Sequence, residues 1–181
     1  HHGSLSPSVS WVDGLLPDNL TVEGDLYLFY KRVRSLPKGL IVEGDLFIGG
    51  TDISVLPPDL IVKGSLSANA TNVEHFPDTL FFGDSLNLDN TKITRLPDGL
   101  TVCGFLSLSC SSIQSLPNGL TVDGELDISG TSISELPAGL KVKGDLFADG
   151  TQLSGLPADL EVEGDVHVND TFIHTEPNCP K

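Results

Sequence analysis

The sequence predicts a mainly β protein: a single right-handed solenoid of about eight twenty-residue coils, with a parallel β-sheet on one face, extended or 3₁₀ return segments and almost no α-helix. Two observations carry this prediction. Proline recurs every twenty residues at nine positions, from Pro17 to Pro177. Leucine stands three residues after each proline from Pro17 to Pro157, and glycine follows four residues later in all of these coils but the one with Asp84. A repeat of this length is typical of stacked coils that bury one another's apolar side chains.

The elements of one coil follow in order. Leu26 and Leu28 are two residues apart, so both side chains point to one side of a short strand, and equivalent pairs recur to Val166 and Val168. A Thr column follows the strand, and we expect its short inward hydroxyls to bond the backbone of the adjacent coil. Proline fixes φ and lacks an N–H, which excludes the Leu-Pro pair from a helix interior. The remaining residues, about ten per coil, fit an extended or 3₁₀ return.

A β-helix of pentapeptide repeats is the alternative twenty-residue solenoid. It requires an inward apolar residue every five positions. The apolar positions here fall at 26, 28, 33, 36, 40 and 42, a spacing that disfavours this alternative.

One turn reads LPxGLxVxGDLxLxGTxIxx, and the stretch LxLxxTxIxxLPxxL resembles the leucine-rich repeat, with Thr where that family usually has Asn. The repeat length and the Leu-Pro pair resemble the short repeats of secreted bacterial effectors over roughly residues 12–176. This resemblance implies a leucine-rich-repeat recognition domain joined to an effector module such as a ubiquitin ligase. No residue here could carry ligase chemistry, so such a module would lie outside this sequence.

The sequence divides into four segments. Residues 1–4 read as a purification-tag remnant, 5–20 as an N-terminal cap, 21–176 as the solenoid and 177–181 as a C-terminal tail. We expect Trp11 and Val12 to cover the first coil, because a large exposed indole would otherwise face water. Near the other end, Phe172 and Ile173 either close the stack or mark a point where a longer chain was cut.

Charge and composition exclude several partners. The 181 residues carry a net charge of −15 and the pI is near 4.4, which opposes broad contact with nucleic-acid phosphates. No apolar run approaches the roughly 18–20 residues of a membrane helix. We therefore expect a monomer that binds neither nucleic acid nor membrane, and we expect no cofactor.

The three cysteines stand at no metal-ligand spacing, so no metal site is predicted. Cys103 and Cys110 fall too far apart along one coil to pair, and Cys110 occupies a column of mostly small residues, where it reads as space-filling. Unpaired thiols favour a reducing compartment, such as the host cytoplasm in which a secreted effector acts.

Outward positions are left for function, and outward aromatic residues are the main candidates for contact. The first coil deviates most, because aromatic and basic residues, the types enriched at binding hot spots, crowd together there. The alternative is an end coil that lacks one neighbour and has relaxed its consensus. The predicted partner-binding residues are Tyr27, Phe29, Tyr30, Arg32, Arg34, Asp45, Phe47, Phe105, Asp127, Phe147 and His167.

Acidic residues also form columns, such as Asp25 with Asp45 and Glu125 with Asp145. Such a column has three interpretations: a solvated face, a surface for a basic partner, or a Ca²⁺ site. The Gly-Asp pair also fits turn chemistry, in which Asp bonds the next backbone N–H. No known calcium-binding motif accompanies it.

Catalysis has little support. His75, His167 and His174 fall at three different phases of the repeat, and no HExxH, GxSxG or phosphate-binding loop is present. We therefore expect a non-catalytic protein-binding solenoid. The alternatives are an acidic inhibitor that mimics nucleic acid, a structural spacer of an adhesin or phage particle, and a carbohydrate-acting enzyme on a β-solenoid.

Overall fold

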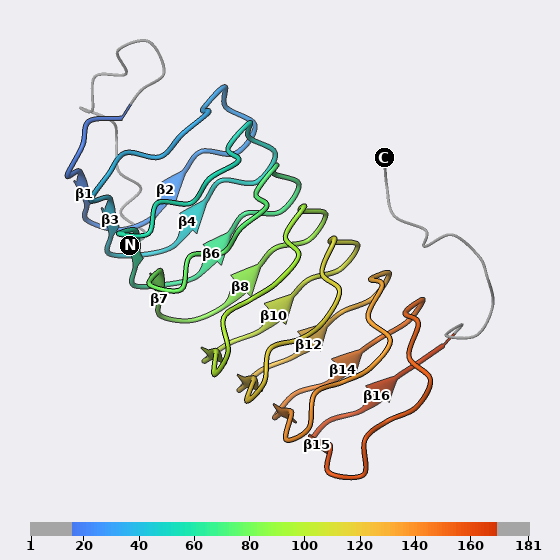
Figure 1. The fold of residues 1–181 in the computed structure, drawn as a ribbon. Coiled ribbons are helices and arrows are strands. Elements are labelled where there is room, and N and C mark those ends of the chain that lie inside the picture. The colour runs from blue at the N-terminus through green and yellow to red at the C-terminus, as the bar shows by residue number, and fades with distance from the viewer. Residues whose placement is uncertain (1–15, 170–181) are drawn as a thin grey trace.

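The computed structural model describes residues 16–169, which form a β-solenoid of about seven turns with no helix (Figure 1). The fold class predicted from the sequence is therefore confirmed. The positions predicted to cap the stack, Trp11 with Val12 and Phe172 with Ile173, lie outside the described residues, as do the predicted tag and tail. Nothing in residues 16–169 is a helix long and apolar enough to cross a membrane.

One sheet runs the length of the described stack, and each coil contributes one two-residue strand to it (Figure 1). All pairings are parallel, and each residue faces its equivalent twenty positions away, as Leu106 faces Leu86 and Leu126. We call this the main sheet. Its strands are β2 (Leu26–Tyr27), β4 (Leu46–Phe47), β6 (Leu66–Ser67), β8 (Leu86–Asn87), β10 (Leu106–Ser107), β12 (Leu126–Asp127), β14 (Leu146–Phe147) and β16 (Val166–His167).

A second strand in each coil precedes the main-sheet strand, a feature that the sequence analysis did not predict. These strands form two four-stranded parallel sheets. The first holds β1 (Thr21–Val22), β3 (Ile41–Val42), β5 (Ile61–Val62) and β7 (Phe81–Phe82). The other holds β9 (Thr101–Val102), β11 (Thr121–Val122), β13 (Lys141–Val142) and β15 (Glu161–Val162).

The division between these two sheets falls at the one coil that lacks the regular glycine. There the glycine comes one position early, as Gly83, and its N–H donates to Gly64 O at 3.0 Å. The next glycine, Gly104, reaches Asp84 O at 3.3 Å, whereas Gly124 reaches Gly104 O at 2.9 Å in the regular pattern. The altered spacing of the fourth coil therefore coincides with the loss of pairing between β7 and β9.

The core is the column of inward side chains between the strands and the return segments. The leucine pairs of the middle coils are fully buried, and both Leu106 and Leu108 are 0% exposed. The β-branched column of the return segment, which includes Ile113, is also buried. The inward positions assigned from the period are thus the core of the protein. The return segments contain no 3₁₀ helix within residues 16–169, so the 3₁₀ alternative of that prediction is wrong.

The Thr column is buried as expected, but its hydrogen bonds are local. Thr51 Oγ1 donates to Ile48 O at 2.7 Å, within the same coil, and the same contact recurs from Thr71, Thr91, Thr131 and Thr151. The predicted bond to the adjacent coil is therefore wrong. The chain turns sharply between the carbonyl and the Thr, and this turn places the hydroxyl over the carbonyl three residues back.

The small residue before each Thr is explained by backbone conformation. Gly50 has φ 66°, and Cys110, at the equivalent position, has φ 55°. This left-handed region favours glycine because a Cβ crowds the backbone there. Cys110 thus stands in a column selected by conformation, and the space-filling interpretation is incomplete.

Candidate partner-binding face

The outward side of the main sheet carries three side chains in each coil, at the positions of Asp25, Tyr27 and Phe29 and every twenty residues after them. We call this surface the main face. In the described coils it holds no Lys or Arg. Its carboxylates are Asp25, Asp45, Asp89, Glu125, Asp127, Asp145, Asp149 and Asp165.

Three aromatic rings gather at the N-terminal end of the main face. The rings of Tyr27 and Phe47 are stacked with centroids 4.8 Å apart, and Phe29 lies 5.2 Å from Phe47. Tyr27 is 48% exposed and Phe29 39%. The parallel register of β2 and β4 places Tyr27 directly opposite Phe47, which accounts for the stack. We call these three residues the N-terminal aromatic cluster.

A hydrogen bond fixes the Tyr27 ring on this face. Its hydroxyl donates to Asp25 Oδ2 at 2.9 Å. This bond, more than the slight desolvation of the ring, raises the pKa of Tyr27 above its ordinary value. Tyr27 therefore stays neutral and keeps its proton on the acidic main face.

Tyr30 extends the aromatic surface to the turn beyond β2. It is 83% exposed and its φ is 51°, a conformation that costs a bulky residue about 1–3 kcal/mol. Its ring lies over Gly50, where an added Cβ would collide with the ring. The glycine of the next coil therefore makes room for this strained side chain.

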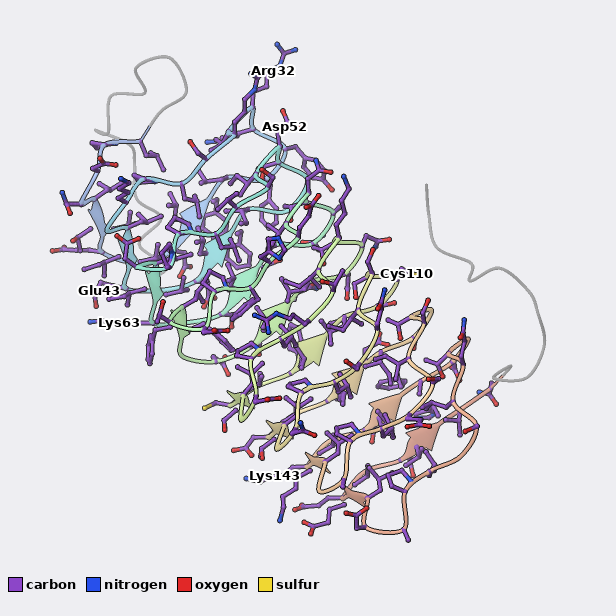
Figure 2. The ribbon with its side chains drawn as sticks, in the orientation of Figure 1. Arg32, Glu43, Asp52, Lys63, Cys110 and Lys143 are labelled. Carbon is purple, nitrogen blue, oxygen red and sulfur yellow. The ribbon has the colours of Figure 1, made fainter. Side chains whose placement is uncertain are left out.

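The predicted basic residues of the first coil lie elsewhere. Arg32 follows the turn, and Figure 2 shows it at the rim of the solenoid, pointing away from the coils near Asp52. Arg34 is exposed in the return segment, one residue after the buried Val33. The structure therefore does not bring these arginines onto the main face with Tyr27 and Phe47.

The remaining predicted residues form a second group toward the other end of the main face. The rings of Phe147 and His167 are stacked 4.6 Å apart with an interplanar angle of 4°. A depression of about 330 Å³ lies beside Phe147, and its other lining side chains are Asn87, Phe105, Ser107, Glu125 and Asp127, over Leu106. Three of the predicted residues, Phe105, Asp127 and Phe147, line this depression, and His167 stacks on Phe147.

The acidic columns have a structural role that the sequence suggested only in outline. Asp25 Oδ1 accepts the N–H of Asp45 at 2.9 Å, and Asp45 Oδ1 accepts the N–H of Ser65 at 2.7 Å. Asp145 does the same for Asp165. From the sequence, each Asp was expected to bond the next backbone N–H within its Gly-Asp turn; that partner was wrong, because the bonded N–H belongs to the following coil, twenty residues on. The recurrence of Asp at one position of the repeat was the sequence signal that could have indicated this bond.

A second column of the main face makes the same kind of bond. Asp89 Oδ1 accepts the N–H of Ser109 at 2.9 Å. Burial raises the pKa of Asp89, and the charge of Asp127 adds to that effect, whereas hydrogen bonds from Ser107 and Ser109 oppose it. Five of the eight main-face carboxylates belong to the last three described coils: Glu125, Asp127, Asp145, Asp149 and Asp165.

The cysteine prediction requires a correction. Cys110 is disulfide-bonded, and Cys103 is exposed and free. Sequence spacing does not reveal which distant cysteines meet in space, so the expectation of three unpaired thiols was wrong. The argument for a reducing compartment loses its basis with it.

Other chemistry finds no assembled site in the described part of the chain. His75 lies in a return segment and His167 on the main face, while His174 lies outside the described residues. Between residues 16 and 169, no group of three or more His, Cys, Asp or Glu side chains could hold a metal ion.

Comparison with known proteins does not place this chain in a family. No known protein family matches the sequence, and no curated protein is similar to it. The fold and the main face are thus the basis for a functional assignment.

Proposed function

We propose that this β-solenoid is a non-catalytic protein-binding module that recognises a partner protein through its main face. The N-terminal aromatic cluster carries the proposal. Tyr27 and Phe29 are exposed, Tyr27 is stacked on the half-buried Phe47, and no interior packing accounts for the exposure of the first two rings. The resemblance to leucine-rich repeats, and to the short effector repeats, supports the same function.

The side chain of Tyr27 is preorganised for contact with a partner. Tyr27 is held between the Phe47 ring and the Asp25 carboxylate, and its strand is fixed by parallel pairing to β4. A partner that covers these rings would gain their burial while ordering few side chains, which reduces the entropic cost of association. Large aromatic side chains of this kind dominate binding energy at protein interfaces.

The test is capture of partner proteins from host-cell lysates, at low and moderate salt, with detection by mass spectrometry. The wild type is compared with the double variant Tyr27→Ala with Phe47→Ala. Phe81→Ala is the matched control, because Phe81 is 54% exposed but lies on β7, outside the main face.

We expect a protein that the wild type and Phe81→Ala retain and the double variant loses. If the double variant retains every captured protein, recognition through the N-terminal aromatic cluster is wrong. Capture that disappears only on raising the salt would favour acidic mimicry of nucleic acid instead. An empty capture under all conditions would favour a structural spacer.

A further inference from the structure

We infer that the depression between Phe105 and Phe147 is a subsite for a basic side chain of the partner protein, with arginine preferred over lysine. The inference rests on the proposed function, since it names the chemistry that the main face recognises. It depends on three observations: the shape and lining of the depression, the charge of the face, and the residue at position 105.

The lining combines aromatic rings with carboxylates. Phe105 and Phe147 belong to coils that are two strand spacings apart, about 9.6 Å. Between them lie Ser107 and Asp127, whose side chains are small enough to leave the depression open. The columns of the two rings are also two residues apart along the strand direction, so a guanidinium group in the depression would lie against one ring, near the carboxylates of Glu125 and Asp127, an environment that arginine favours.

The carboxylate of Asp127 is held in place for such a contact. Its Oδ1 accepts the N–H of Ser129 at 2.8 Å, which leaves Oδ2 to face the depression's occupant. Stacking on an aromatic ring beside such a carboxylate favours arginine, because a lysine ammonium is a point charge without a planar face.

The charge of the surroundings selects a cation. The main face carries eight carboxylates in the described coils and no Lys or Arg, so no basic side chain on this face competes for Glu125 or Asp127. Ion pairs such as Lys143 with Asp123, at 2.8 Å, lie along the two four-stranded sheets and not on the main face. Such a one-signed surface steers oppositely charged partners toward it.

Position 105 shows that the aromatic ring is not a requirement of the fold. In the other described coils this column holds Asp, Ser or Glu, and Phe105's own N–H donates to Ser85 Oγ at 3.1 Å. Phe105 offers no oxygen to the N–H of Glu125 in the next coil. Its side chain is nevertheless 43% exposed. At position 105 an exposed ring beside the depression therefore takes the place of a side chain that could accept a cross-coil hydrogen bond.

The test measures binding of fluorescein-labelled hexa-arginine to the whole chain by fluorescence anisotropy at 150 mM salt. Hexa-lysine and hexa-glutamate are measured in the same way, and cellohexaose is added as a competitor of hexa-arginine. Phe105→Ser removes the ring without a change in charge and restores the residue type of its column. Phe147→Ser does the same for the other ring, since Ser67 and Ser107 share its column. Asp127→Asn removes one charge, and Glu163→Gln is its matched control outside the main face.

We expect hexa-arginine to bind several-fold tighter than hexa-lysine. Phe105→Ser and Phe147→Ser should each weaken hexa-arginine about tenfold, and Asp127→Asn should weaken it more than Glu163→Gln, which stays within twofold of wild type. Urea unfolding checks that each variant folds. The inference is overturned if both Ser variants bind as the wild type does, if hexa-arginine fails to bind, or if cellohexaose displaces the peptide.

The two proposals can fail separately. If the Ser variants leave hexa-arginine binding unchanged while the Tyr27→Ala, Phe47→Ala variant loses its captured protein, the subsite is wrong and the protein-binding function stands. If hexa-arginine binding depends on Phe105 but the double variant keeps every captured protein, the subsite stands and the role of the N-terminal aromatic cluster is wrong.

Discussion

Replacing Asp45 by Ala should destabilise the solenoid, although Asp45 is a partly exposed acidic residue on a strand face. Its Oδ1 accepts the N–H of Ser65 at 2.7 Å, and that N–H is partly buried between coils. Leaving such a donor without an acceptor costs about 1–3 kcal/mol, and partial access of water puts Asp45→Ala near 1–2 kcal/mol. Asp45→Asn keeps an oxygen for Ser65 and removes the repulsion between stacked Asp25 and Asp45, so it should lie within about 0.5 kcal/mol of wild type.

The measurement is urea unfolding followed by far-UV circular dichroism. Asp52→Ala is the control, because Asp52 is exposed in the same coil and makes none of the cross-coil bonds described above. We expect Asp52→Ala to change the free energy of unfolding by less than about 0.5 kcal/mol. If Asp45→Ala, Asp45→Asn and Asp52→Ala all have the same stability, the acidic column is only a solvated surface and the hydrogen-bond account is refuted.

Three further outcomes are expected. Leu106→Ala should cost about 2–5 kcal/mol in urea unfolding, because Leu106 is fully buried between Leu86 and Leu126; an unchanged midpoint would contradict its inward position. Ser111→Thr should raise the urea midpoint, since Ser111 Oγ is buried with no hydrogen-bond partner and an added methyl contributes about 0.8 kcal/mol; a lower midpoint would show that the site has no room. Asp89→Asn should stabilise the protein at pH 7 and lose that advantage as the pH falls, because the raised pKa of Asp89 means that its charged form weakens the fold above that pKa; equal stability gains at pH 7 and pH 4 would contradict this.

Most of the fold could be predicted because its interior repeats. Side chains such as Leu106 and Ile113 recur at one phase, and a strictly periodic inward column has few three-dimensional solutions. The second strand of each coil was not predicted, because a two-residue strand such as Thr121–Val122 is too short to show an alternation of apolar and polar residues. The Thr hydroxyl was assigned to the wrong coil because periodicity shows which side chains point inward, and not which carbonyl the turn brings closest.

The site was less predictable than the fold. The predicted outward placement of Tyr27 and Phe47 is confirmed, and their rings stack because the register aligns them, whereas their role in binding stays a prediction. The arginines were grouped with them by nearness in sequence, yet the turn after Phe29 carries Arg32 to another side of the coil (Figure 2). The depression beside Phe105 depends on side chains from several coils, which no single repeat contains.

Because β7 and β9 do not pair, the junction between the fourth and fifth coils is the weakest in the described stack. Each coil contacts mainly its neighbours, so resistance to pulling or to partial unfolding is set by the poorest junction and not by the average one. At this junction the second strands of the two coils are unpaired and the glycine hydrogen bond is stretched to 3.3 Å, while the main sheet continues from β8 to β10. Under tension the described chain should therefore separate into two blocks of four coils, with the main sheet as the last connection to break.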